Sequence, residues 1–192
     1  SAVGSRGGLG GRGPQRLCKG CHVIRRRSLL VVTAVAPGVA ACGAAEVKTF
    51  PKLADAAKAI EALATGHKHS GAWTLAQMLN HAAQSIDYSI DGYPEMKSAL
   101  FRAVIGGVAF GVFQARGRMS HALDEPIPGA PALDAQAALA PSIERALAAL
   151  RRFEAHNGAL APHFAYGALD KAQYTRAHLM HLVNHWTEVQ RA

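Results

Sequence analysis

Residues 73–90 read WTLAQMLNHAAQSIDYSI, and the spacing of apolar residues in this stretch decides the fold class. The apolar positions recur every three or four residues, at Leu75, Leu79, Ala82 and Ile86. This spacing places them on one face of an α-helix, which we expect to pack against other helices. The sequence DGYP that follows at 91–94 is typical of a turn and ends the predicted helix.

Helical periodicity continues on both sides of this stretch. Further helices are predicted over residues 52–64, 95–115, 135–156 and 170–190. Because no useful period-two alternation appears, a β-sheet is not expected. The sequence therefore predicts an all-α fold over residues 50–192, preceded by a linker over 42–49. The expected architecture is a four-helix-type bundle with an additional helix and long connections.

Charge and cysteine placement separate the first 41 residues from the rest of the chain. Residues 1–41 hold seven of the 21 Lys and Arg residues and none of the 13 Asp and Glu residues. The remainder carries 14 basic and 13 acidic residues, and a net charge of +1 gives no electrostatic basis for nucleic-acid binding. The cysteines are Cys18, Cys21 and Cys42, so the predicted domain has no thiolate site of its own.

Residues 25–41 have the order of an export signal. Arg25, Arg26 and Arg27 precede an apolar stretch that is as long as a signal h-region and too short to span a bilayer comfortably. RRSLL at 26–30 resembles the twin-arginine export motif, and VAAC at 39–42 resembles a lipobox. We therefore expect export to the periplasm or cell envelope, with lipidation at Cys42 as the sole membrane anchor. A plain secretory signal with an incidental cysteine is the alternative.

Residues 1–24 are Gly- and Arg-rich, and we expect them to be disordered because such a composition cannot form a core. The chain begins with Ser1 rather than Met, which fits a native start farther along, near Val23. The sequence CKGCH at 18–22 matches the c-type haem attachment pattern. It precedes the predicted signal, on the side that is discarded, so haem is not expected.

Histidines near the C-terminal end indicate a metal site. Residues 177–185 read AHLMHLVNH, and spacings of three and four put His178, His181 and His185 on one helix face. Imidazoles at i and i+4 can chelate one divalent ion, and a third ligand from another helix completes a catalytic-type site. His81 is the candidate, because it lies on the flank of the apolar face of the 73–90 helix. A packed histidine face without metal is the alternative.

Two short stretches resemble a known superfamily. WTLAQMLNH at 73–81 resembles the W-S-x-x-E-x-L-x-H-L segment of the DinB/YfiT-like superfamily, with Thr for Ser and Gln for Glu. HFAYG at 163–167, followed by the histidine helix, is similar to one of its branches of unknown function. The resemblance covers roughly residues 50–190. It implies a four-helix bundle that holds zinc or nickel through three histidines, one from the second helix and two from the last. Activities in the superfamily include thiol transfer and metal-dependent hydrolysis.

The resemblance assigns His81 as the first ligand. The last helix departs from the H-x-x-x-H-x-x-Q pattern that members often show. His181 with His185 keeps the i, i+4 spacing and has Glu188 in place of the Gln, so this is the preferred pair. His178 is then an alternate ligand or a proton shuttle one turn away.

These observations lead to one main functional hypothesis and one alternative. The main hypothesis is an exported metal-dependent enzyme of hydrolase or thiol-transferase type. Its expected partner is an unknown small molecule, with a thiol as one candidate class, and a homodimer is a further expectation. The alternative is a non-catalytic metal-binding or interaction lipoprotein with the same bundle. We also expect Asp87 or Glu188 to accept hydrogen bonds from the outward nitrogens of the ligand rings.

Overall fold

The computed structural model describes residues 49–192. Four predictions concern residues that lie outside the described part, apart from the last residue of the linker. They are the upstream segment 1–24, the signal peptide 25–41, the lipidation site Cys42 and the linker 42–49.

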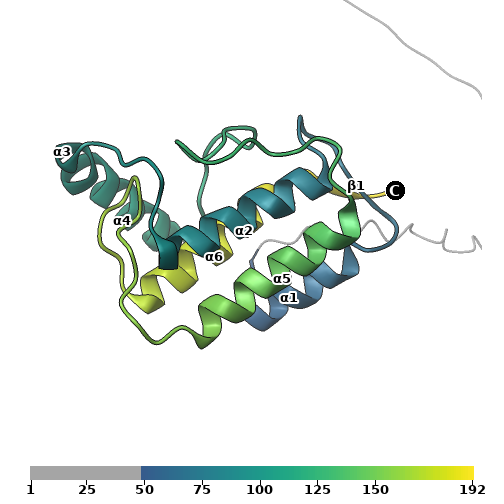
Figure 1. The fold of residues 1–192 in the computed structure, drawn as a ribbon. Helices are drawn as coiled ribbons and strands as arrows, with labels where there is room; N and C mark the ends of the chain where they lie inside the picture. Colours follow the sequence, from purple (N-terminus) through teal and green to yellow (C-terminus); the bar gives the residue numbers. More distant parts are fainter. Residues whose placement is uncertain (1–48) are drawn as a thin grey trace, which may run out of the picture. The chain divides into compact units, whose positions relative to one another are not determined.

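Each of the five helical segments predicted from the sequence is helical in the structure (Figure 1). The elements in chain order are α1 (Leu53–Ala62), β1 (His67–His69), α2 (Leu75–Asp91), α3 (Ala99–Phe101), the π-helix η1 (Arg102–Gly106), α4 (Gly107–Arg116), α5 (Leu139–Ala155), α6 (Lys171–Trp186) and β2 (Val189–Arg191). The helix predicted over 95–115 is thus a run of three elements, α3, η1 and α4, which we call the 99–116 arm.

The expectation of no sheet is wrong at one place in the described chain. Strands β1 and β2 pair antiparallel, with His67 opposite Arg191 and His69 opposite Val189. Three-residue strands are too short to produce a period-two pattern, so the sequence carried no signal for them. The strand β2 also explains why α6 ends at Trp186, four residues before the predicted end.

Helices α1, α2, α5 and α6 enclose the main core. Helix α2 packs against α5 and α6, and α1 packs against the same two helices (Figure 1). The apolar face predicted for α2 is buried along its whole length, and it meets Ile60, Phe153 and Leu182 from the other three helices. Burying each such side chain stabilises the fold by about 1.5–3 kcal/mol. The predicted apolar face is therefore confirmed as the centre of the core.

The two helices that carry the candidate ligands begin with the same device. Thr74 caps α2 in a capping box with Gln77, and Asp170 caps α6 in a capping box with Gln173. In each box two backbone N–H groups at the helix start donate to side-chain oxygens, and loss of such a cap costs about 1 kcal/mol. The caps fix where each helix starts and hence which face each histidine occupies.

The 99–116 arm is held differently from the other helices. Its contact with the segment after α5 depends on Gly106, because a Cβ atom there would lie 1.7 Å from the carbonyl oxygen of Ala165. Gly111, by contrast, faces open space. The close approach that glycine permits here is therefore between a helix and a loop. Several large apolar side chains of the arm are exposed, including Leu100, Val104 and Val108.

Candidate metal centre

Three histidines from two helices converge on one point, as the sequence predicted. Helix α2 supplies His81, and α6 supplies His181 and His185, which are one turn apart. The Nε2 atom of His181 lies 3.1 Å from Nε2 of His81 and 3.0 Å from Nε2 of His185. The three ligand atoms all lie within 4.8 Å of one another. On α6 this arrangement brings together His181 and His185, the pair preferred from the sequence.

Burial keeps these rings in their neutral form. Desolvation, followed by the charge of neighbouring histidines, lowers the pKa of His81 to about 4 and that of His185 to about 2. The same two causes lower the pKa of His181 well below its ordinary value. At neutral pH each ring can therefore offer a nitrogen lone pair, which is the form that binds a metal.

The spacing of the Nε2 atoms fits a shared ion better than hydrogen bonding alone. Each Nε2 carries either one hydrogen or one lone pair. Nε2 of His181 can therefore form a good hydrogen bond with only one of its two neighbours, His81 or His185. A tetrahedral ion at about 2.0–2.1 Å from each nitrogen requires separations of roughly 3.3 Å. The observed 3.0 and 3.1 Å are close to that value. The three histidines could therefore hold a metal ion.

The expected partners of the outward nitrogens are not in place. Nδ1 of His81 and Nδ1 of His185 are buried without a hydrogen-bond partner among the described residues. Asp87 instead pairs with Arg152 at 3.2 Å, because its position on α2 faces α5. Glu188 lies 3.5 Å from Nε2 of His69, where Gly71 leaves room for its carboxylate. The prediction that one of these two carboxylates accepts from a ligand ring is therefore wrong.

Trp73 covers one flank of the three histidines. Its ring stacks on His185 at 6.0 Å between centroids and lies 4.9 Å from the ring of His81. Trp73 stands just before the cap of α2, so the same turn that starts the helix also places the indole. The sequence singled out this tryptophan through the resemblance, and the structure gives it a physical role as a wall of the site.

His178 does not join the three histidines, although it shares their helix. It is buried, and its Nε2 lies 3.3 Å from the hydroxyl oxygen of Ser89. Its ring packs edge-on against Phe153 and stacks on Tyr174. Burial lowers its pKa to about 3. A role as proton shuttle stays a prediction, and it would require the contact with Ser89 to break.

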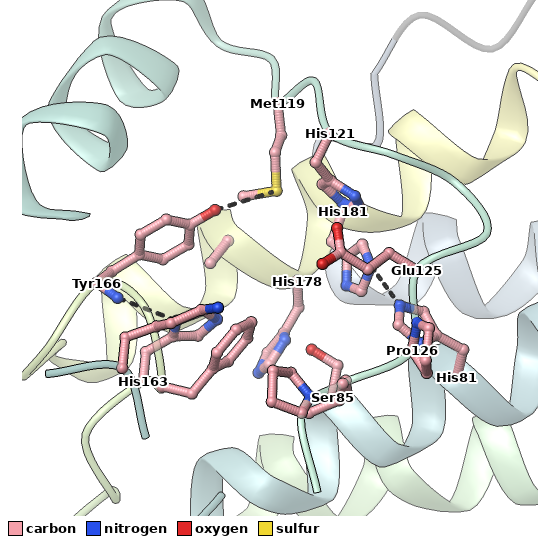
Figure 2. Close-up of a pocket in the computed structure, with 15 residues that line it drawn as sticks. His81, Ser85, Met119, His121, Glu125, Pro126, His163, Tyr166, His178 and His181 are labelled. Atoms are coloured by element: carbon pink, nitrogen blue, oxygen red, sulfur yellow. Dashed lines mark hydrogen bonds between the residues drawn. The ribbon is translucent and has the colours of Figure 1, made fainter. Parts of the chain in front are cut away.

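A cavity of about 210 Å³ opens beside the histidines. His81, His178 and His181 line one side of it, as Figure 2 shows. Met119, Ile127 and Phe164 contribute apolar surface, and Lys97 and Glu125 contribute charge. The cavity is large enough for a small molecule and gives it direct access to two of the three converging rings.

The stretch HFAYG at 163–167 forms the opposite wall of this cavity. Nδ1 of His163 accepts hydrogen bonds from the backbone amides of Ala165 and Tyr166, at 3.1 and 3.2 Å, and the ring stacks on that of Tyr166. The neutral ring therefore carries its hydrogen on Nε2. Gly167 closes the turn with a φ of 81°, a left-handed conformation that favours glycine. This second stretch of the resemblance thus shapes the cavity and lies apart from the converging nitrogens.

One histidine near the site was missed by the sequence analysis. His121 lies in the connection between α4 and α5, and its ring centroid is 5.0 Å from that of His181 and 5.6 Å from that of His185. No periodicity or motif surrounds it, so its position beside α6 could not be predicted from local pattern. Its proximity depends on the path of a long connection.

The fold and the site define a helical domain with a three-histidine candidate metal centre beside a cavity. The family model of DUF1569, described as a protein of unknown function, matches residues 45–192. The chain belongs to the DUF1569 family. Comparison with curated proteins finds no match, and neither does comparison with solved structures.

Proposed function

We propose that His81, His181 and His185 hold one divalent metal ion, zinc or nickel, and that the protein is a metal-dependent enzyme of hydrolase or thiol-transferase type. The observation that carries this proposal is the convergence of three histidine nitrogens beside a cavity, with His81 and His185 buried and His181 half-buried. Zinc and nickel are both suited to imidazole nitrogen.

A catalytic site is favoured over a structural one by the number of ligands and by their surroundings. Structural zinc sites have four protein ligands, whereas catalytic sites use three and keep one position open. His81 and His181 border the cavity, so the open position would face a space that admits water or a small molecule. A metal there would lower the pKa of a bound water or thiol, which is the chemistry that hydrolysis and thiol transfer require.

We also propose that the domain is a four-helix bundle of the DinB/YfiT-like type. Helices α1, α2, α5 and α6 would form the bundle, and the 99–116 arm would be the additional helix. The stretch 73–81 supports this, as does the origin of one candidate ligand from α2 and two from the last helix. Export with lipidation at Cys42 is a separate proposal that rests on the leader sequence alone, and membrane fractionation of Cys42→Ser tests it.

The test is the metal content of the purified full chain. With Zn²⁺ or Ni²⁺ we expect one ion per chain, and His81→Ala, His181→Ala and His185→Ala should each lose most of it because two ligands hold an ion poorly. His156→Ala is the matched control, since its ring bonds to the carbonyl of Ala159 outside the site. Equal metal content in all four variants would refute the site. A screen for hydrolysis and thiol transfer with the loaded protein then separates an enzyme from a non-catalytic metal-binding protein.

A further inference from the structure

The ring of His121 is as close to that of His181 as the converging rings are to one another, and it lies slightly farther from that of His185. The ring centroids of the three histidines are separated by 5.0, 5.0 and 4.8 Å. The centroid of His121 lies 5.0 Å from that of His181 and 5.6 Å from that of His185. A fourth imidazole therefore stands within reach of the same point, and it comes from a connection rather than from a helix.

The hydrogen bonding of His121 leaves the lone pair of its Nε2 free to bind a metal ion. Its Nδ1 lies 2.7 Å from the carbonyl oxygen of Ala122, and because a carbonyl can only accept, Nδ1 must carry the hydrogen. The lone pair of the neutral ring is then on Nε2. A backbone carbonyl that accepts from one ring nitrogen while the other nitrogen faces the ion is the usual arrangement for metal-binding histidines. Nδ1 of His121 already has the carbonyl partner of this arrangement, whereas the outward nitrogens of His81 and His185 have none.

The backbone around His121 is attached to the helix that carries two of the ligands. The side-chain amide of Asn184 donates a hydrogen bond to the carbonyl oxygen of His121 at 3.3 Å. Asn184 precedes His185 on α6, so the attachment point is next to a ligand. This hydrogen bond holds the backbone of His121 close to α6, while its exposed side chain is left with room to rotate.

His121 also stands on the side where the coordination position is open. It lines the same cavity as His81 and His181, and Figure 2 shows it reaching from its connection toward His181. Trp73 covers a flank formed by His81 and His185 and is not part of the cavity wall. A fourth ligand can therefore approach from the cavity, and His121 is the histidine placed to do so.

We propose that His121 is a fourth, exchangeable ligand of the ion, an inference that rests on the metal site proposed above. The nitrogens of His121 are not among the three ligand atoms, from His81, His181 and His185, that lie within 4.8 Å of one another. Ligation therefore requires the exposed ring of His121 to turn toward the ion. With His121 bound, four imidazoles close the site. With His121 released, the fourth position opens to the cavity, and a water or a small molecule with a donor atom such as a thiolate takes its place. Substrate binding is then a competition with His121.

The full chain loaded with Co²⁺ alone tests this, because the visible spectrum of Co²⁺ depends on the number and type of its ligands. We expect His121→Ala to bind Co²⁺ at least about tenfold more weakly, the lower end of what loss of a supporting group costs a metal site. Its visible spectrum should differ from that of the parent protein, and millimolar free imidazole should restore the parent spectrum by occupying the vacated position. His156→Ala should keep the parent spectrum throughout.

The remaining outcomes distinguish failure of the fourth ligand from failure of the metal site itself. If loaded His121→Ala has the parent spectrum, His121 is not a ligand, while the three-histidine site stands. If the spectrum changes and imidazole does not restore it, the effect of His121 is indirect and ligation is refuted. If the parent protein takes up no Co²⁺, the metal site and the fourth ligand both fail. Circular dichroism of His121→Ala checks that the helices are intact.

Discussion

Helix α2 and the 99–116 arm look alike in sequence and differ in their surroundings. Both are rich in apolar residues at helical spacing, and both begin at a side-chain cap, Thr74 in α2 and Ser98 in the arm. In α2 the apolar face is buried against three other helices. In the arm, Leu100 is 75% exposed and Val108 is 66% exposed. Periodicity therefore predicts that a helix forms, but not that its apolar face has a partner.

The arm has one further property that α2 lacks. By length and composition, Ala99–Arg116 is the one helix in the described part of the chain that could cross a membrane, and 11% of it is buried. A single helix of this kind is weak evidence of a membrane span, because signal sequences and core helices meet the same criteria. The contrast can be measured as a difference in stability. The same substitution should change the free energy of unfolding by different amounts in the two regions.

The largest expected difference is between two identical substitutions. Leu79→Ala in α2 should lower the free energy of unfolding by about 2–5 kcal/mol, because it leaves a cavity in a closely packed core. Leu100→Ala in the arm should change it by less than about 0.5 kcal/mol, since that side chain is mostly exposed. Urea unfolding of both variants measures the two values. Similar losses would mean that the arm is packed in solution against something that covers Leu100.

Features set by local spacing could be predicted from the sequence, whereas features set by contacts between distant residues could not. The helices could be predicted because apolar spacing is a local property, and the convergence of His81, His181 and His185 followed because two of them share a helix face. Strands β1 and β2 were missed because three residues carry no period. His121 was missed because the path of a long connection depends on contacts between distant residues. The partners of Asp87 and Glu188 were wrong for the same reason: neighbouring elements, not spacing, decide them.

The second prediction concerns low pH, which should destabilise the core and leave the arm unaffected. Burial lowers the pKa of His178 to about 3 from 6.5 in the unfolded chain. Between these pH values the unfolded state binds more protons, so the free energy of unfolding falls as the pH is lowered from about 6.5. His178 alone should account for about 3 kcal/mol of loss by pH 4, at 1.36 kcal/mol per pKa unit. The arm has no His, Asp or Glu between residues 99 and 116 and contributes no such term.

The pH dependence of His178→Gln measured without metal isolates this contribution. In urea unfolding at pH 7, 5 and 4, the free energy of unfolding should fall less with decreasing pH in the variant than in the parent. This holds whatever the variant's stability at pH 7. Equal slopes in the two proteins would mean that His178 is protonated as easily in the folded state as in the unfolded one. His178 would then not be buried in solution as it is in the structure.

The third and smallest effect compares two glycines of the arm. Gly106→Ala should cost about 1–3 kcal/mol, because the new Cβ meets the carbonyl of Ala165 and forces the backbone to move. Gly111→Ala meets open space within a helix and should stabilise the arm by about 0.5–1 kcal/mol. Hydrogen exchange of the arm amides measures both changes locally. Equal protection in the two variants would show that the contact with Ala165 does not hold the arm.

The pairing of His81 with His181 has a consequence for the stability of the whole domain. The two residues are 100 positions apart in the chain, and an ion between them would be a cross-link between α2 and α6. A covalent cross-link closing a loop of 100 residues contributes about 4.7 kcal/mol in the chain-entropy model. A metal cross-link contributes a similar amount, about 4.1 kcal/mol, when the free ion is a thousand times above its dissociation constant, and nothing when the ion is absent. No cysteine follows Cys42, so a disulfide cannot take over this task within the domain. The resistance of the domain to unfolding would therefore rise and fall with the metal supply around it.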